Sequence, residues 1–318
     1  MSGLSSTSKA EAEDRFDEGP ISSGDEPEKE VVARPFIKWA GGKHRLLPSY
    51  EALGLLPRFE GTYIEAFLGG GAAFFYLKPK KALLVDRNED LVTTYNAVKS
   101  QVYKLIDELR AHAKAHELYG KDHYYTVRNE RPTKAIERAA RFIYLNRTCY
   151  NGLYRVNSSG EFNVPMGEYK NPRIVDAPGL IAASRALRHA TITHGDYNEI
   201  ETVAQKGDFA FFDPPYDPLD GKPSFTSYTK DDFASADQER LRDLFERLAA
   251  KGVKALVSNS DTSRIRSLYK KWTILDVAAT RAINSKGTGR QTINELAIAN
   301  FKPAPRRTLE AFKHPGLR

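Results

Sequence analysis

Short apolar runs alternate with amphipathic segments in two separate stretches of the chain, and this alternation predicts parallel strands covered by helices. In the first stretch we predict a helix at 44–53, a strand at 62–66, a helix ending at Tyr76 and a strand at 82–86. In the second stretch we predict strands at 190–194, 208–212 and 253–258, and helices at 235–250 and 262–270. Segments 273–279 and 292–300 are predicted to close the sheet as an antiparallel pair, and Asn88 and Ser235 are predicted helix caps.

The region from about residue 97 to 189 lacks this alternation of strand and helix. Helical periodicity is present at 98–118 and 132–146, the second helix opening with Pro132 in its first turn. Residues 150–165 are polar and aromatic with glycines, which indicates a hairpin or a structured loop. We therefore expect an inserted helical subdomain.

These patterns predict an α/β fold, with a Rossmann-like sheet that is interrupted by the helical insert. The order of strand, glycine loop, helix and strand ending on an acid is that of a mononucleotide-binding half. The expected parts are a disordered acidic tail at 1–34, a sheet domain at 35–96 and 190–303, an insert at 97–189 and a basic tail at 304–318.

Composition narrows the class of protein. At 318 residues and 41% hydrophobic content, the chain has enough apolar material for a sizeable core. No apolar run approaches membrane-spanning length and the first residues do not have the layout of a secretory signal, so we expect a cytoplasmic protein that does not enter membranes. The single cysteine, Cys149, excludes a disulfide framework and cysteine-based zinc clusters, and the seven histidines lack metal-ligand spacing. No metal and no obligate protein partner are expected.

The net charge of +7 is unevenly distributed along the chain. Residues 1–34 contain four basic and nine acidic residues, a net charge of −5, so the remainder carries +12. A part this basic suits a polyanionic partner such as nucleic acid, although a generally basic soluble surface would give the same count.

The first candidate for a catalytic site is Asp213-Pro214-Pro215-Tyr216, directly after the apolar strand at 208–212. Proline cannot continue a sheet ladder and stiffens the following turn, so these residues form a rigid corner at the carboxyl end of a strand. The corner offers a carboxylate, a proline carbonyl and an aromatic ring. Together these can hold a planar ring that bears an amino group.

The glycines at 69–71 follow the first predicted strand, and Asp86 ends the second. Glycines permit close approach of a ligand to the backbone, and the acid can accept hydrogen bonds from ribose hydroxyls, which favours an adenosine-containing cofactor. Trp39 and Lys43 add an aromatic wall and a cation for a carboxylate. S-adenosylmethionine combines adenosine, a carboxylate and a transferable methyl group.

With this donor, the expected reaction is direct methyl transfer to an exocyclic ring amine. Asp213 and the Pro214 carbonyl would accept the N–H groups, which frees the amine lone pair, while Tyr216 stacks on the base. In duplex DNA the base must first be flipped out, at a cost of a few kcal/mol.

The chain resembles the DNA adenine methylase family, typified by enzymes that modify GATC. The resemblance runs from about Pro35 to about Pro303. It rests on matching stretches in the family's order and spacing: Phe36-Ile37-Lys38-Trp39-Ala40-Gly41-Gly42-Lys43, Glu65-Ala66-Phe67-Leu68-Gly69-Gly70-Gly71, Tyr144-Leu145-Asn146-Arg147, Tyr150-Asn151-Gly152-Leu153, Gly160-Glu161-Phe162-Asn163-Val164-Pro165, Asp213-Pro214-Pro215-Tyr216 and Ser258-Asn259.

The resemblance implies roles for individual residues. The catalytic motif is Asp213, Pro214, Pro215 and Tyr216, and the cofactor contacts are Trp39, Lys43, Phe67, Gly69, Asp86 and Asp213. The DNA contacts are Arg147 to phosphate, Tyr150, Asn151 and Leu153 at the flipped base, Arg155 to a guanine, and Pro165 near the recognised bases. Glu168 departs from close relatives, which often have a basic residue there and so a contact to a flanking phosphate.

We therefore expect a Rossmann-like, S-adenosylmethionine-dependent methyltransferase that acts on adenine N6 in double-stranded DNA at GATC. Methylation of cytosine N4 uses the same amine geometry and is the alternative reaction, although sequences for that task usually carry serine in place of Asp213. A DNA-binding regulator without catalysis is the alternative class, against which the intact motifs argue.

Overall fold

The computed structural model describes residues 31–219, 233–280 and 292–305. The sequence also leaves open a lid over the target base at 224–228 and a phosphate contact at 284–290, each with an ordinary loop or turn as the equal alternative. Both segments, and most of the two predicted tails, lie outside the described residues. Among the described residues, no helix is long and apolar enough to cross a membrane, and no cluster of three or more His, Cys, Asp or Glu side chains is arranged to hold a metal ion.

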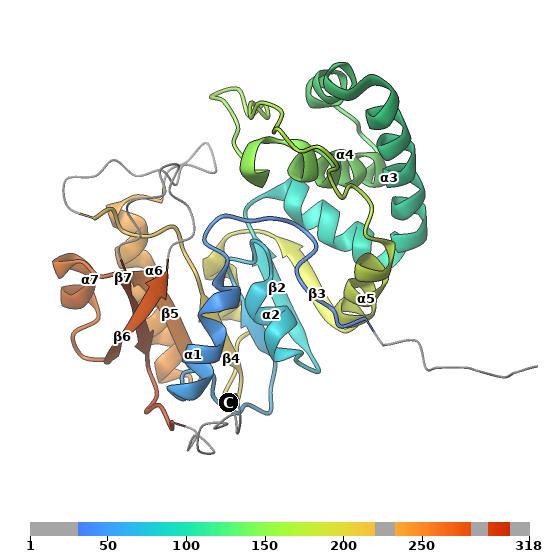
Figure 1. The fold of residues 1–318 in the computed structure, drawn as a ribbon. Helices are drawn as coiled ribbons and strands as arrows, with labels where there is room; N and C mark the ends of the chain where they lie inside the picture. The colour runs from blue at the N-terminus through green and yellow to red at the C-terminus, as the bar shows by residue number, and fades with distance from the viewer. Residues whose placement is uncertain (1–30, 220–232, 281–291, 306–318) are drawn as a thin grey trace, which may run out of the picture. The chain divides into compact units, whose positions relative to one another are not determined.

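A seven-stranded sheet forms the centre of the described part and confirms the predicted α/β fold (Figure 1). Its order is β3-β2-β1-β4-β5-β7-β6, with β1 to β5 parallel and β7 antiparallel to both neighbours, as predicted for the closing pair. The strands are β1 (Tyr63–Glu65), β2 (Ala82–Asp86), β3 (Ala190–His194), β4 (Phe209–Phe212), β5 (Lys254–Ser260), β6 (Thr273–Thr280) and β7 (Thr292–Ala299).

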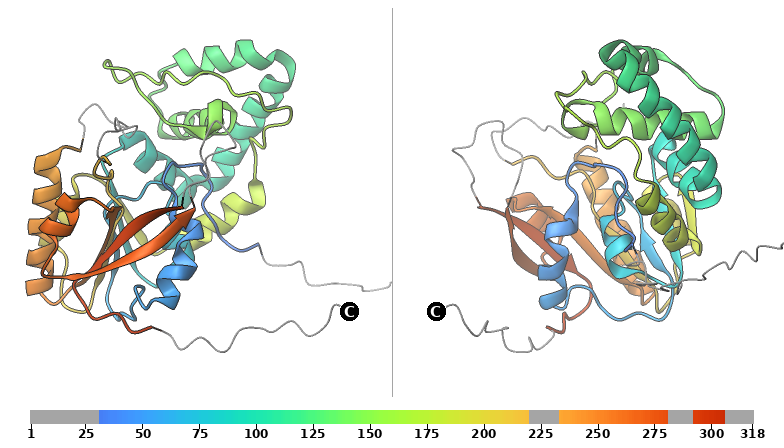
Figure 2. Two further views of the ribbon diagram at one scale, coloured as in Figure 1. Left: turned by 60° about the vertical axis from the view of Figure 1, so that its left-hand side comes forward. Right: turned by 45° about the vertical axis from the view of Figure 1, so that its right-hand side comes forward.

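Helices connect the strands and build the predicted helical region, which appears in green above the sheet in Figure 2. They are α1 (Leu47–Ala52), α2 (Ala72–Leu77), α3 (Glu89–Asn129), α4 (Ala135–Thr148), α5 (Ala177–Leu187), α6 (Ser235–Ala250) and α7 (Ser263–Leu268), with 3-10 turns η1 (Lys43–Arg45), η2 (Tyr150–Gly152) and η3 (Tyr197–Thr202).

Several local predictions can be checked against these bounds. Asn88 caps α3 by accepting a hydrogen bond from the Leu91 amide, as predicted. Pro132 lies before α4 and not in its first turn, and Ser235 is the first residue of α6 and not its cap. Helix α5 was not predicted, although Asp176 caps it through the Gly179 amide.

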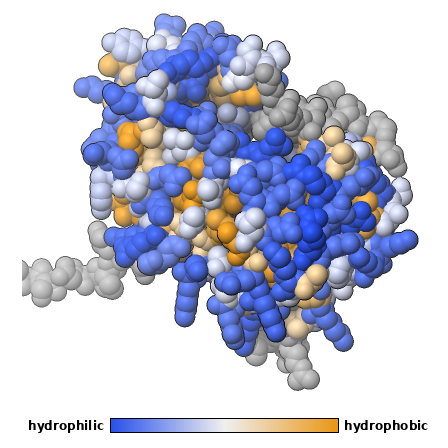
Figure 3. Space-filling view, turned by 180° about the vertical axis from the view of Figure 1, so that it is seen from behind, coloured by the Kyte–Doolittle hydropathy of each residue, from blue (hydrophilic) through white to orange (hydrophobic). Residues whose placement is uncertain are grey.

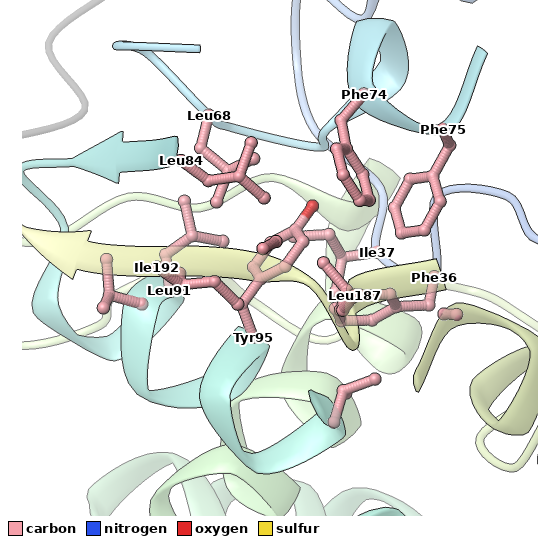
Figure 4. Packing of buried hydrophobic residues seen from close by; sticks show 14 of the residues in the cluster. Phe36, Ile37, Leu68, Phe74, Phe75, Leu84, Leu91, Tyr95, Leu187 and Ile192 are labelled. Carbon is pink, nitrogen blue, oxygen red and sulfur yellow. The ribbon is translucent and has the colours of Figure 1, made fainter. Parts of the chain in front are cut away.

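Two buried clusters lie on opposite faces of the sheet, because neighbouring strand residues point to opposite sides. Phe209 and Phe211 belong to one cluster, while Ala210 and Phe212 belong to the other. The first cluster continues from the sheet into α3, α4 and α5, so the helical region shares its hydrophobic core with the sheet. Figure 4 shows part of it, with Tyr95 among aromatic and aliphatic side chains. Hydrophilic residues cover most of the face in Figure 3, and hydrophobic ones gather toward its middle.

Candidate active site and base-reading loop

The corner at 213–216 lies where the carboxyl ends of the parallel strands meet. Strand β4 pairs with β1 on one side and β5 on the other, with Phe212 opposite Val257. This register brings Ser258 beside Asp213, and its hydroxyl donates to Asp213 Oδ1 at 2.8 Å. The corner therefore lies at the sheet edge where open α/β folds bind their ligands, as predicted.

Asp213 is held in a defined orientation. Lys43 Nζ lies 2.8 Å from the same Oδ1 atom that accepts from Ser258, and the Asp213 side chain is 22% exposed. Among the described residues, the contacts of the carboxylate that we find both end on Oδ1. Oδ2 is thus the oxygen left to accept a hydrogen bond from a ligand.

Lys43 is buried between two carboxylates, since its Nζ also lies 3.7 Å from Glu295 Oε1. Its ammonium stands 4.7 Å from the centre of the Tyr216 ring. The Tyr50 hydroxyl donates to Glu295 Oε1 at 2.7 Å. Burial raises the pKa of Glu295, and the positive charge of Lys43 opposes this. The Lys43 ammonium is therefore paired with protein carboxylates. We did not predict this pairing from the sequence.

A second set of polar side chains fixes the backbone of the corner. Gln238 donates to the Pro215 carbonyl at 3.1 Å, and Asn259 donates to Gln238 at 3.0 Å. The Asp217 amide donates to Asn259 Oδ1 at 2.9 Å. These groups are buried and paired, so they hold the turn after β4 in one shape. Gln238 has no signal in the sequence that would mark this role.

The glycine loop after β1 is shaped for close packing. Gly69 has φ +46°, and a Cβ at this position would lie 2.7 Å from Trp39 Cδ1. Its amide donates to Asp86 Oδ2 at 2.9 Å, and its carbonyl accepts from Tyr95 at 3.2 Å. The Asn88 amide donates to Asp86 Oδ1 at 2.9 Å. The structure thus brings together three of the predicted cofactor residues.

Aromatic side chains flank this loop on both sides. Trp39 stacks with Tyr154 at 5.7 Å and with Phe142 at 6.4 Å between ring centres. On the other side, Phe67 stacks on Tyr197 at 5.1 Å. Both Trp39 and Phe67 are only partly buried, so each keeps surface for a planar ligand.

The residues around Asp86 fit an adenosine-containing cofactor. A carboxylate has about four lone-pair positions, and the two backbone amides use two of them, so Asp86 can still accept from hydroxyl groups. Burial raises the pKa of Asp86, while the same two amides stabilise its charged form. The clash that a Cβ on Gly69 would make with Trp39 shows that glycine is required at position 69. The predicted cofactor contacts remain Trp39, Lys43, Phe67, Gly69, Asp86 and Asp213.

Glu65 ends β1 beneath this site and is fully enclosed. It accepts from the Tyr63 hydroxyl at 2.9 Å and from the Phe74 amide at 3.0 Å. Burial is the main reason that its pKa is raised to about 8. At neutral pH the carboxyl is therefore mostly protonated, which reduces the negative charge near Asp86 and Asp213.

Glu65 predicts a specific dependence of stability on pH. The pKa of Glu65 in the folded protein, about 8, exceeds the value of 4.5 for an unperturbed carboxyl. Its contribution to the free energy of unfolding is therefore full below about pH 4.5 and is lost as pH rises through about 8. We expect Glu65→Gln to be more stable than the parent protein at alkaline pH, with a gain in melting temperature that grows between about pH 5 and pH 9. A difference that stays constant over this range would contradict the buried proton.

The loop after α4 is fastened to the segment that carries Trp39. Asn146 accepts from the Lys38 amide at 2.8 Å and donates to the carbonyls of Lys38 and Gly152 at 2.8 and 3.1 Å. Gly152 has φ +65°, and a Cβ there would lie 2.4 Å from Lys38 Cδ. The loop after α4 and the segment that carries Trp39 are therefore held together by these contacts.

The predicted DNA-contacting residues are placed on this loop. Tyr150 is 48% exposed, Asn151 has φ +55°, and Leu153 is half-buried. The Arg155 side chain is exposed and its Nε donates to Asn163 Oδ1 at 2.7 Å. The exposed Pro165 accepts from the Tyr150 amide at 2.9 Å. Isolated antiparallel bridges join Cys149 to Met166 and Val156 to Phe162, so the segment doubles back as an irregular hairpin without regular strands.

The predicted phosphate contact at Arg147 and the departure from relatives at Glu168 are described by their own surroundings. Arg147 is half-buried, and its Nη2 donates to the Phe36 carbonyl at 2.6 Å, so a phosphate contact would have to form beside this bond. Burial lowers the pKa of its guanidinium. Glu168 is exposed, and its acidic side chain offers no positive charge to a flanking phosphate.

Comparison with known proteins identifies what this arrangement is similar to. Residues 39–283 match the model of the D12 class N6 adenine-specific DNA methyltransferases. The type II methyltransferase M.MjaIII of Methanocaldococcus jannaschii is 43% identical over 289 residues, which cover 85% of this chain and 100% of that protein. The type II methyltransferase M1.LlaDCHI of Lactococcus lactis subsp. cremoris is 40% identical, covering 85% and 96%. The DNA adenine methylase of Serratia marcescens is 37% identical, covering 83% and 97%.

Proposed function

Because this chain belongs to the D12 class of N6 adenine-specific DNA methyltransferases, we propose that it methylates adenine within GATC in double-stranded DNA, after flipping the base into the corner at 213–216. Membership of this class makes the chain an adenine-specific DNA methyltransferase whose methyl donor is S-adenosylmethionine, and it removes the cytosine alternative. The observation that carries the proposal is the single orientation of Asp213, whose Oδ1 is held by Ser258 and Lys43.

The corner presents its groups to the exocyclic amine. Asp213 Oδ2 accepts one N–H and the Pro214 carbonyl accepts the other, so that the amine lone pair turns out of the base plane. Tyr216 stacks on the base. The Gln238 contact to the Pro215 carbonyl keeps the turn rigid, which lowers the cost of positioning in the transition state.

The glycine loop and its aromatic flanks hold the cofactor beside this corner. Asp86 accepts from the ribose hydroxyls, and Trp39 and Phe67 lie against the adenosine. Bound there, S-adenosylmethionine supplies an electrophilic methyl group. Because Asp86 and Trp39 both contact Gly69, a change at any of the three affects the same binding surface.

The loop after α4 reads the sequence and supports the flipped base. Tyr150 and Asn151 project at its exposed end, where they fill the space that the base leaves, with Leu153 packed behind them. Arg155 keeps its two terminal nitrogens for guanine O6 and N7, since the contact to Asn163 uses only Nε. Arg147 and Pro165 border the same surface.

Arg155→Ala should weaken discrimination at one G·C pair by about 1–3 kcal/mol, because a bidentate contact to guanine is lost. The measurement is the methylation rate on duplexes that carry GATC or a single substitution at each position. Lys170→Ala, an exposed basic residue beyond the loop, serves as the matched loss of charge. An unchanged base preference in Arg155→Ala would remove this residue from readout.

Flipping can be tested on its own with 2-aminopurine in place of the target adenine. This base fluoresces when unstacked, so binding to a GATC duplex should raise its emission, and binding to a scrambled duplex should not. Methylation of GATC without any rise in emission would contradict extrusion of the base into the corner.

A further inference from the structure

Two carboxylates share one buried ammonium group beside the corner. Lys43 Nζ lies 2.8 Å from Asp213 and 3.7 Å from Glu295, and the three side chains are 6%, 22% and 9% exposed. Asp213 and Lys43 alone would be a neutral pair. With Glu295 ionised, the three groups carry one net negative charge.

Under the proposed function, on which this inference rests, the reaction creates positive charge at this place. The N6 lone pair forms the bond to the methyl carbon, and the electron pair of the broken carbon–sulfur bond stays on sulfur. The positive charge thereby moves to N6, which then gives one proton to Asp213 and through it to solvent. In a partly desolvated site, a nearby net negative charge stabilises such a transition state more than it would in water.

We propose that Glu295 is a positioning residue for methyl transfer: by neutralising Lys43, it leaves the negative charge of Asp213 available to the amine as that amine becomes cationic. Glu295 acts through Lys43 and does not touch the base. Its place on β7 and the hydrogen bond from Tyr50 at 2.7 Å hold its carboxylate within 3.7 Å of the ammonium.

The groups that face Glu295 come from three elements: Lys43 from η1, Tyr50 from α1, and Asp213 with Tyr216 from the corner. Since the carboxyl must be ionised to act, the transfer rate should fall as pH drops through its raised pKa. Glu295→Gln should lack this fall on the acidic side of the pH–rate profile, its acidic limb. Tyr50→Phe should move the acidic limb to higher pH, because the Glu295 carboxylate loses a hydrogen-bond donor.

The test is the single-turnover rate of methyl transfer to a GATC duplex at saturating S-adenosylmethionine. Glu295→Gln should be slower by about ten- to a hundredfold, the effect of losing one interaction with a charged group. The charge role also predicts that the deficit of Glu295→Gln shrinks as pH falls, because the protonated Glu295 of the parent no longer neutralises Lys43 either. A merely structural role for Glu295 would slow the variant by the same factor at every pH.

Controls separate the possible failures. Asp276→Asn, an exposed acid on the adjacent strand β6, should keep the parent rate. A parent-like rate in Glu295→Gln, or a deficit that stays the same at every pH, would overturn the inference while an inactive Asp213→Asn upholds the proposed function. An active Asp213→Asn would instead refute the proposed corner. Should Glu295→Gln fail to fold, the shift of the acidic limb in Tyr50→Phe still decides the matter, and an unshifted limb counts against Glu295.

Discussion

Asp213→Ala should lower the rate of methyl transfer by at least about a thousandfold, since it removes the acceptor that we propose aligns the amine. Ser258 and Lys43 lose a shared partner, but Lys43 keeps Glu295, so the protein should still fold. Rates are measured with tritiated cofactor under single-turnover conditions, alongside DNA affinity by fluorescence anisotropy. Affinity for DNA should change little, because the loop after α4 is untouched.

The matched control for this variant is Asp276→Ala, which removes an exposed acid from the edge strand β6. It should methylate DNA like the parent. Substantial methylation by Asp213→Ala would mean that the amine is aligned by another group, and the assignment of the corner would be wrong.

Asp86→Ala should have the second largest effect, a loss of cofactor affinity of at least about a hundredfold. The carboxylate is proposed to accept from the ribose hydroxyls, and two hydrogen bonds to a charged group contribute about 1.5–3 kcal/mol each. The variant also leaves the amides of Gly69 and Asn88 without their acceptor, so the glycine loop should loosen. Calorimetric titration with S-adenosylmethionine measures the effect.

Glu89→Ala is the control, because Glu89 is an exposed acid three residues further along the chain that pairs with Arg138. Its cofactor affinity should match that of the parent. If Asp86→Ala bound the cofactor as tightly as Glu89→Ala does, the ribose would have to be held elsewhere.

The sheet and the corner were predictable because their signals are local. Strand β4 is a run of aromatic and small apolar residues that ends at an acid and two prolines, and such a run has few alternatives to a buried strand. Helix α5 escaped prediction because its first turn contains Pro178 and Gly179, which resemble a loop when the cap at Asp176 is overlooked.

The partners of Lys43 were not predictable, because they depend on contacts between distant segments. Tyr50 and Glu295 are 245 residues apart, and they meet only because β7 inserts between β5 and β6. The acid directly before the apolar run at the end of β7 was the one available signal, since a carboxylate at a core position needs a partner. Sequence spacing cannot show which partner that is.

The central claim is that this protein places a methyl group on adenine N6 within GATC. The most direct measurement is sequencing of unmethylated DNA, by a method that detects modified bases, after incubation with the protein and S-adenosylmethionine. We expect N6-methyladenine at the adenine of GATC on both strands, and its absence after incubation with Asp213→Ala. Methylation at a different sequence, or of a base other than adenine, would contradict it.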